Sequence, residues 1–213
     1  MNSEEYEIYK FIKSSIYSAQ TKTDTTEDMY HHNTSYSFTP KVIKHGLLSL
    51  NEKRKLYNFN LDDETIFKLN DESYVNGTDD ISLSVVGLPD IDENDFEYNP
   101  FSYFYVDIII SSRVKARRNS KNYANEFLVS EKINNSDFRA IDIRLLEYIK
   151  KTFADPNISE DEKKKRIIEC YNYLRKIAVA LKEANLDIPL REMSDGNITL
   201  DKEKVSCFKK LKV

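Results

Sequence analysis

The sequence has no tryptophan, only four glycines and only two cysteines among its 213 residues. Neither a Walker A loop nor a GxGxxG fingerprint occurs, which excludes the P-loop NTPases, protein kinases and Rossmann dehydrogenases that hold phosphates with glycine-rich turns. The HExxH, GxSxG and CxxC motifs are also missing. The common signatures of hydrolases and of zinc sites are therefore absent.

Long apolar runs are missing as well. No stretch approaches the roughly 18 apolar residues that a membrane span needs, and Met1–Glu5 lacks the features of a signal peptide. Cys170 and Cys207 have no partner at zinc-ligand spacing, so we expect two ordinary thiols and no metal. These absences predict a cytoplasmic protein without a membrane partner.

The residues that are present predict a folded chain. It is 40% hydrophobic, 12% aromatic and 32% charged, which is too apolar for a disordered protein and suits one domain with a helical annex. The formal net charge of −4 argues against binding nucleic acid or membranes through overall charge. A local basic patch must therefore carry any such interaction.

Several segments have clear helical signals. Apolar residues at steps of three and four predict a helix over 4–19, and Pro40 with Gly46 marks the two ends of a short helix over 39–46, capped by Thr39. The segment 20–28 reads as a linker. The segment 51–80 has no sustained period and is interpreted as an insertion, either a lid or a surface feature, with one short helix over 63–69.

The second half of the chain combines strands with helices. β-branched and aromatic runs predict strands over 81–86, 103–110, 126–129 and 138–143. Helices are expected at Leu145–Phe153 and after a capping box at Ser159–Glu162, and a hairpin or extended arm around 198–205. The predicted fold is α+β with a mostly antiparallel sheet, divided into 1–28 (helix and linker), 29–143 (core) and 144–213 (C-terminal helical pair and tail).

Four short pieces then occur in a suggestive order: Tyr30-His31-His32-Asn33-Thr34-Ser35, Ile43-Lys44-His45-Gly46-Leu47-Leu48-Ser49, Ile81-Ser82-Leu83-Ser84 and Ala124-Asn125-Glu126-Phe127-Leu128-Val129. Together they resemble the ADP-ribosyltransferase family. Its members often have a strand ending in His-x-Thr-Ser, a helix closing in Gly-Leu, a second strand with Ser-x-Ser, and a late strand that begins with the catalytic Glu. The last piece is most like the nucleic-acid-modifying toxins of the DarT type.

The resemblance implies an NAD-dependent mono-ADP-ribosyltransferase with a split antiparallel sheet, acting as a toxin, defence factor or effector, possibly in a host cytoplasm. Glu126 would be catalytic, because a carboxylate stabilises the oxocarbenium-like ribose that forms when the nicotinamide bond breaks. The residues implied to bind NAD are His32, Thr34, Ser35 and Ser82. His32 fits the first motif better than His31 does.

One position departs from the family pattern. The family's second strand often carries a Tyr where this chain has Ser82, so Tyr103, Tyr105 or Tyr123 is an alternative stacking partner for nicotinamide. Glu126 also has an alternative role, as a charge that protects an edge strand from pairing.

A basic run lies directly before Glu126. Between Ser112 and Asn125 there are five basic residues and no acidic one: Arg113, Lys115, Arg117, Arg118 and Lys121. In the family this position recognises the acceptor, so the run favours an acceptor that bears phosphates, such as nucleic acid, over a protein. The alternative is a solvated loop without a partner. A cognate antitoxin or inhibitor is a further possible partner.

Two other functions stay open. A non-catalytic module of the same fold would bind nucleic acid or a protein without using NAD. A nuclease or phosphotransferase would use His31 or His32 with the basic run. A shared metal ion is disfavoured, because adjacent residues on a strand point to opposite faces.

Overall fold

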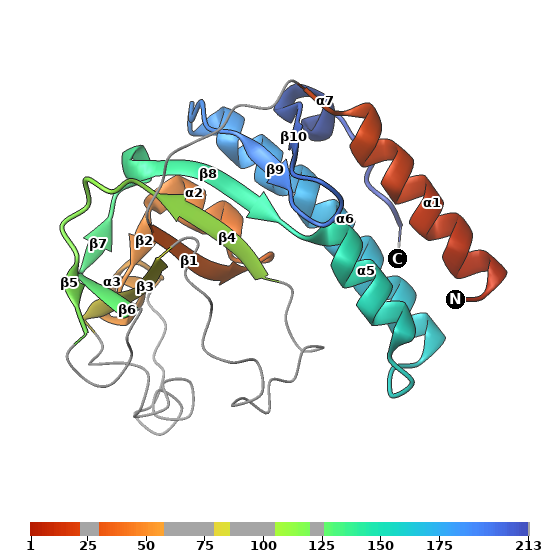
Figure 1. Ribbon diagram of the computed structural model, residues 1–213, viewed down its shortest axis with the longest axis horizontal. Coiled ribbons are helices and arrows are strands. Elements are labelled where there is room, and N and C mark those ends of the chain that lie inside the picture. The colour runs from red at the N-terminus through yellow and green to blue at the C-terminus, as the bar shows by residue number, and fades with distance from the viewer. Residues whose placement is uncertain (22–29, 58–78, 86–104, 120–125, 213) are drawn as a thin grey trace.

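A computed structural model describes residues 1–21, 30–57, 79–85, 105–119 and 126–212, and these ranges form an α+β fold (Figure 1). Eight strands make one sheet in the order β10-β9-β8-β4-β1-β3-β6-β5, while β2 and β7 form a separate pair. All neighbours are antiparallel except β8 and β9. The predicted α+β class with a mostly antiparallel sheet is confirmed. No helix in these ranges is long and apolar enough to cross a membrane.

The strands of the main sheet are β1 (Tyr30–Ser35), β3 (Asp80–Val85), β4 (Tyr105–Ile110), β5 (Arg117–Arg118), β6 (Glu126–Ser130), β8 (Phe138–Ile143), β9 (Leu190–Glu192) and β10 (Ile198–Leu200). The small pair is β2 (Leu47–Leu48) and β7 (Lys132–Ile133). The strands predicted over 81–86, 126–129 and 138–143 are confirmed within a residue at each end. The strand predicted over 103–110 is confirmed from Tyr105, since 103 and 104 lie outside the described residues.

β3 has one apolar and one polar side, because successive strand residues point to opposite sides. Ile81 and Leu83 of β3 are buried, whereas Ser82 between them is partly exposed. The buried face belongs to one core that also includes Ile108 of β4 and apolar residues of α2 and α6. Figure 1 shows α2 and α6 behind this part of the sheet.

β1 pairs very differently with its two neighbours. It pairs with β4 along its whole length, from Tyr30 to Ser35. With β3 the register covers only Tyr30 opposite Val85 and His31 opposite Ser84. Beyond His31, β1 stays paired with β4 and β3 with β6. The ladder between β1 and β3 is therefore short and confined to one end.

The short helix α2 (Thr39–His45) is confirmed, and Gly46 ends it with φ 84°. That left-handed conformation favours glycine, and a Cβ at Gly46 would meet the carbonyl oxygen of Ile133 at 2.3 Å. The prediction that Thr39 caps this helix is wrong. Phe38 occupies the N-cap, and the Thr39 hydroxyl donates to the carbonyl of Ser35 at 2.9 Å, because the turn that starts at Ser35 begins the helix one residue earlier.

A helix that was not predicted, α3 (Leu50–Tyr57), follows α2. None of its residues is fully buried, which explains why the sequence shows no apolar period there. It starts where the Ser49 carbonyl accepts from the N–H of Lys53 at 2.9 Å. The interpretation of 51–80 as an insertion without a helix at its start is therefore wrong, and the helix predicted over 63–69 lies outside the described residues.

The remaining helices follow the sequence signals closely. α1 (Ser3–Ser18), α5 (Leu145–Ala154) and α6 (Glu160–Glu183) match the predicted helices, and α7 (Lys202–Ser206) is added. Ser159 caps α6 by accepting from the N–H of Glu162 at 3.3 Å, while the Glu162 carboxylate accepts from Arg166 at 2.8 Å. The predicted capping box is thus confirmed for its serine half.

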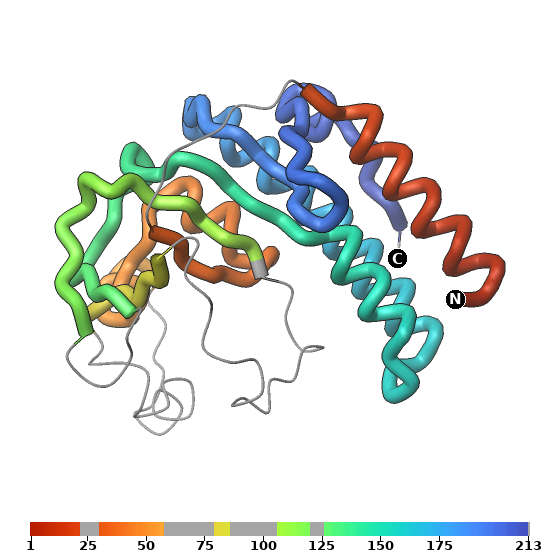
Figure 2. Tube along the Cα trace, viewed as in Figure 1, coloured from red at the N-terminus to blue at the C-terminus, as the bar shows by residue number. Residues whose placement is uncertain are grey.

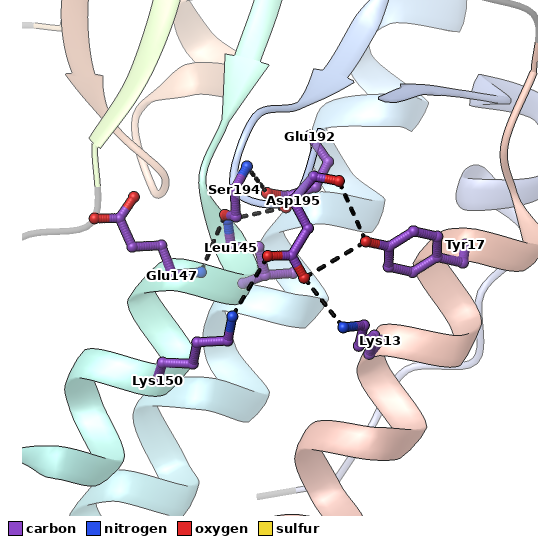
Figure 3. Close-up of polar contacts among 8 residues, drawn as sticks. All are labelled: Lys13, Tyr17, Leu145, Glu147, Lys150, Glu192, Ser194 and Asp195. Carbon is purple, nitrogen blue, oxygen red and sulfur yellow. Dashed lines mark hydrogen bonds and ion pairs between the residues drawn. The ribbon is translucent and has the colours of Figure 1, made fainter. Parts of the chain in front are cut away.

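The hairpin or arm predicted around 198–205 is confirmed only for β10, which pairs with the earlier strand β9, whereas residues 202–205 belong to α7 and that part of the prediction is wrong. Glu192 of β9 is fully buried and accepts from the backbone N–H of Leu145 at 3.0 Å and of Ser194 at 2.8 Å (Figure 3). The buried carboxylate therefore caps the N-terminus of α5, where helix N–H groups lack partners within the helix.

Asp195, at the tip of this hairpin, ties two helices together. Its carboxylate contacts Lys13 of α1 at 3.1 Å and Lys150 of α5 at 3.4 Å, and Tyr17 lies beside it (Figure 3). The two labelled chain ends lie in the same region of the fold (Figure 2), where residues of α1 line one hollow together with Leu211 and Lys212.

Candidate functional site

The carboxylate of Glu126 is held from two sides. Oε1 accepts a hydrogen bond of 2.5 Å from the Ser82 hydroxyl on the neighbouring strand β3. Oε2 accepts from the side-chain amide of Asn119, whose backbone N–H also donates to the Glu126 carbonyl at 2.9 Å. Asn119 is buried and Glu126 is partly exposed. Two donors thus fix the orientation of a carboxylate that still reaches solvent.

His32 of β1 contacts Ser82, the residue whose hydroxyl bonds Glu126. Its Nδ1 lies 2.8 Å from the backbone carbonyl of Ser82. A carbonyl only accepts, so Nδ1 carries the proton and Nε2 is left as an acceptor. Burial is the main cause that lowers the pKa of His32 to about 4, which makes the ring neutral at pH 7. Within the described ranges, Nε2 has no hydrogen bond.

The structure therefore brings together three of the predicted site residues. His32, Ser82 and Glu126 form one chain of hydrogen bonds across β1, β3 and β6. The side chain of His32 contacts β3 just beyond His31, where the ladder between β1 and β3 stops. Ser82 is the link, because its carbonyl accepts from His32 and its hydroxyl donates to Glu126.

His31 has different partners. It lies opposite Ser84, which lies opposite Glu126, so these residues form one row across three strands. Its Nδ1 is 3.4 Å from the carboxylate of Asp107, which also lies 3.6 Å from Arg144. Among the residues with described positions, no group of three or more His, Cys, Asp or Glu side chains could hold a metal ion.

Thr34 and Ser35, the other residues predicted to bind NAD, lie away from this chain of contacts. Thr34 is buried. The Ser35 carbonyl accepts from the Phe38 N–H at 3.0 Å, and its hydroxyl is 3.2 Å from that of Ser37, so it shapes the turn into α2. Tyr105 is the first residue of β4, whereas Tyr103 and Tyr123 lie outside the described residues.

The basic run lies beside Glu126, at the edge of the sheet. Arg118 lies opposite Phe127, the residue that follows Glu126. Arg117 bonds the carboxylate of Asp80. The members of the run within the described ranges are all exposed, namely Arg113, Lys115, Arg117 and Arg118. Lys121 lies outside those ranges.

Two residues of the site were not predicted. Asn119 lies seven positions before Glu126, and no spacing rule connects them, because the β5–β6 pairing sets their contact. Lys53 is partly buried on α3, and burial lowers its pKa. Its charge is one of the causes that lower the pKa of His32. The sequence around Lys53 has no regular apolar spacing, so nothing in it indicates that this lysine is partly buried or that it influences His32.

Two hollows on the described surface, of about 330 and 350 Å³, lie along α1 and are not lined by His32, Ser82 or Glu126. The candidate site is therefore identified by the hydrogen bonds among its residues and not by either of these two hollows. Comparisons of the chain with protein-family models, with curated proteins and with solved structures found no match.

Proposed function

We propose that this chain is an NAD-dependent mono-ADP-ribosyltransferase that modifies a macromolecular acceptor, in the manner of a toxin, defence factor or effector. The observation that supports it most is the chain of contacts from His32 through Ser82 to Glu126. These residues come from three distant segments, and their types are those that the family resemblance assigns to the site. The short ladder between β1 and β3 is in keeping with a split sheet.

The chemistry follows from the groups present. When the bond between ribose C1′ and the nicotinamide nitrogen breaks, its electron pair leaves with nicotinamide and positive charge develops on the ribose. Glu126 stabilises that charge, and it accepts the proton that the acceptor's nucleophile loses on bonding to C1′. Ser82 and Asn119 keep the carboxylate oriented for both tasks.

His32 has the complementary role of binding the ribose. Because Nδ1 donates to the Ser82 carbonyl, Nε2 can accept a hydrogen bond from a ribose hydroxyl. The low pKa of His32 keeps this acceptor available at neutral pH.

Nucleic acid is the proposed class of acceptor. Four exposed basic side chains described before β6 offer ion pairs to phosphates beside Glu126. Asp80 offsets part of the charge of Arg117, so Arg113 and Lys115 would contribute more to the attraction than Arg117 does.

A thermal-shift titration with NAD tests the proposal. A ligand that binds only the native state at 100 times its Kd stabilises it by about 2.7 kcal/mol. We expect a dose-dependent rise in Tm that His32→Ala removes and that the neighbouring control His31→Ala retains. No rise at about 1 mM NAD would contradict the proposal and favour a non-catalytic binding module.

A further inference from the structure

A compact basic and aromatic cluster lies where α2 and α3 meet, and we call it the Phe38–Tyr57 cluster. Its members are Phe38, Lys41, His45, Lys53 and Tyr57. The rings of Phe38 and Tyr57 meet edge to face with centroids 5.9 Å apart, and the His45 ring meets Tyr57 at the same distance. Steps of three and four residues place these side chains on facing sides of the two helices.

Two ammonium groups converge on the ring pair. Nζ of Lys41 lies 4.8 Å from the centroid of Tyr57 and 5.4 Å from that of Phe38. Nζ of Lys53 lies 5.4 Å from the centroid of Phe38, so both lysines share one ring. The two cations therefore flank the same aromatic pair, whose ring faces attract an ammonium group.

No carboxylate neutralises this pair within the described part of the chain, where neither Lys41 nor Lys53 has an ion pair or a side-chain hydrogen bond. Lys55 on the same helix shows the contrast, because it is exposed and pairs with Glu52 at 2.6 Å. Lys53 is partly buried, and a desolvated cation without an anion is unfavourable. The cluster therefore has the charge and the desolvation of a site that binds an anion.

One member of the cluster, Lys53, also influences His32 of the candidate site. The charge of Lys53 reaches His32, whose pKa it lowers. A small anion is favoured over a polymer backbone, because Lys53 is partly buried whereas the basic side chains before β6 are exposed.

We propose that the Phe38–Tyr57 cluster binds the pyrophosphate group of a nucleoside diphosphate, with Lys53 as the principal contact and Lys41 as the second. Each ammonium donates hydrogen bonds to phosphate oxygens, and the bound anion neutralises the partly buried charge of Lys53. That this nucleotide is NAD rests on the proposed function, whereas the phosphate site itself does not.

Calorimetric titration of the full chain with ADP and with adenosine tests this inference, since the two ligands differ only in the pyrophosphate. We expect ADP to bind and adenosine to bind at least roughly tenfold more weakly. Lys53→Gln should weaken ADP binding by about tenfold or more, Lys41→Gln less, and the control Lys55→Gln not at all. Lys53→Arg should retain most of the affinity because it keeps the charge.

Circular dichroism melting shows which variants fold, and Lys53→Arg with Lys41→Gln keeps the test decisive if Lys53→Gln does not fold. Equal affinity for ADP and adenosine, or unchanged ADP binding in folded Lys53 and Lys41 variants, would overturn the inference. The inference would also be overturned by a short oligonucleotide that displaces ADP from the wild type but not from Lys53→Arg, because Lys53 would then bind a nucleic-acid backbone. ADP binding by a wild-type chain that transfers no ADP-ribose from NAD would leave the phosphate site standing and remove the proposed reaction.

Discussion

The hydroxyl of Ser82 donates a hydrogen bond of 2.5 Å to Oε1 of Glu126 on the adjacent strand. The backbone carbonyl of the same serine accepts from His32. One residue thus couples a neutral imidazole to a carboxylate, through two different groups. The two contacts can be separated experimentally, because a side-chain substitution removes only the first.

Ser82→Ala should lower the rate of ADP-ribose transfer about tenfold and the free energy of unfolding by about 1 kcal/mol, the typical value of one hydrogen bond. His32 keeps its carbonyl partner, so NAD should still raise the Tm. Initial rates with labelled NAD and urea unfolding measure the two effects. Ser84→Ala is the control, since within the described residues that side chain has no hydrogen bond. Equal losses in both variants would argue against a specific role for Ser82.

Glu126→Gln should reduce transfer by about 10² to 10⁴-fold, because the amide neither stabilises a cation nor takes a proton. It keeps the size of the side chain, and with its oxygen towards the Asn119 amide and its NH₂ towards the Ser82 hydroxyl it keeps both contacts, so the Tm should change little. Mass spectrometry of DNA, RNA and protein acceptors after incubation with NAD measures transfer. Glu131→Gln, directly after the end of the same strand, is the control and should remain active. An undiminished rate in Glu126→Gln would mean that another group is catalytic.

The stability should depend on pH through His32. Its folded pKa of about 4 lies below the ordinary value of 6.5, so the fold favours the neutral ring. The stabilising contribution is complete above pH 6.5 and is lost as the pH falls towards 4, by at most about 3 kcal/mol.

Urea unfolding of the wild type and of His32→Gln, between about pH 7 and pH 4, measures this effect. The difference in unfolding free energy between them should shrink steadily across that range. Parallel curves would show that His32 titrates normally.

Gly46→Ala should destabilise the fold by about 2 kcal/mol or more, because strain at positive φ adds to a clash with a backbone carbonyl. The added Cβ would lie 2.3 Å from the carbonyl oxygen of Ile133. Gly196→Ala is the matched control, since its φ is 100° but nothing lies within 4 Å of its Cβ. It should lose only the strain, about 1 kcal/mol. Chemical unfolding measures both variants, and equal losses would contradict the clash.

The elements that could be predicted from sequence are those whose buried apolar residues recur at a regular spacing. α6 begins at a serine cap and repeats its apolar residues, and β3 alternates Ile81, Ser82 and Leu83 between core and surface. α3 escaped prediction because it buries none of its residues completely. The parallel pairing of β9 with β8 escaped it too, since α5 and α6 separate the two strands in the chain.

The candidate site also contains residues that could be predicted from sequence and residues that could not. His32, Ser82 and Glu126 belong to short motifs whose order along the chain is legible, and the structure brings them together. Asn119 and Lys53 depend on tertiary contacts with Glu126 and Phe38, which no local pattern encodes. The roles of all five stay predictions until they are measured.

The position of α1 has a consequence for the order in which the chain folds during synthesis. The backbone N–H of Thr21 donates to the carbonyl of Thr199 at 2.9 Å, and Ala19 accepts from Asp201. Thr199 emerges from the ribosome 178 positions after Thr21, which at about 5 to 20 residues per second is a delay of roughly 10 to 35 seconds. The end of α1 therefore lacks these two contacts until β10 and the residue after it have been synthesised.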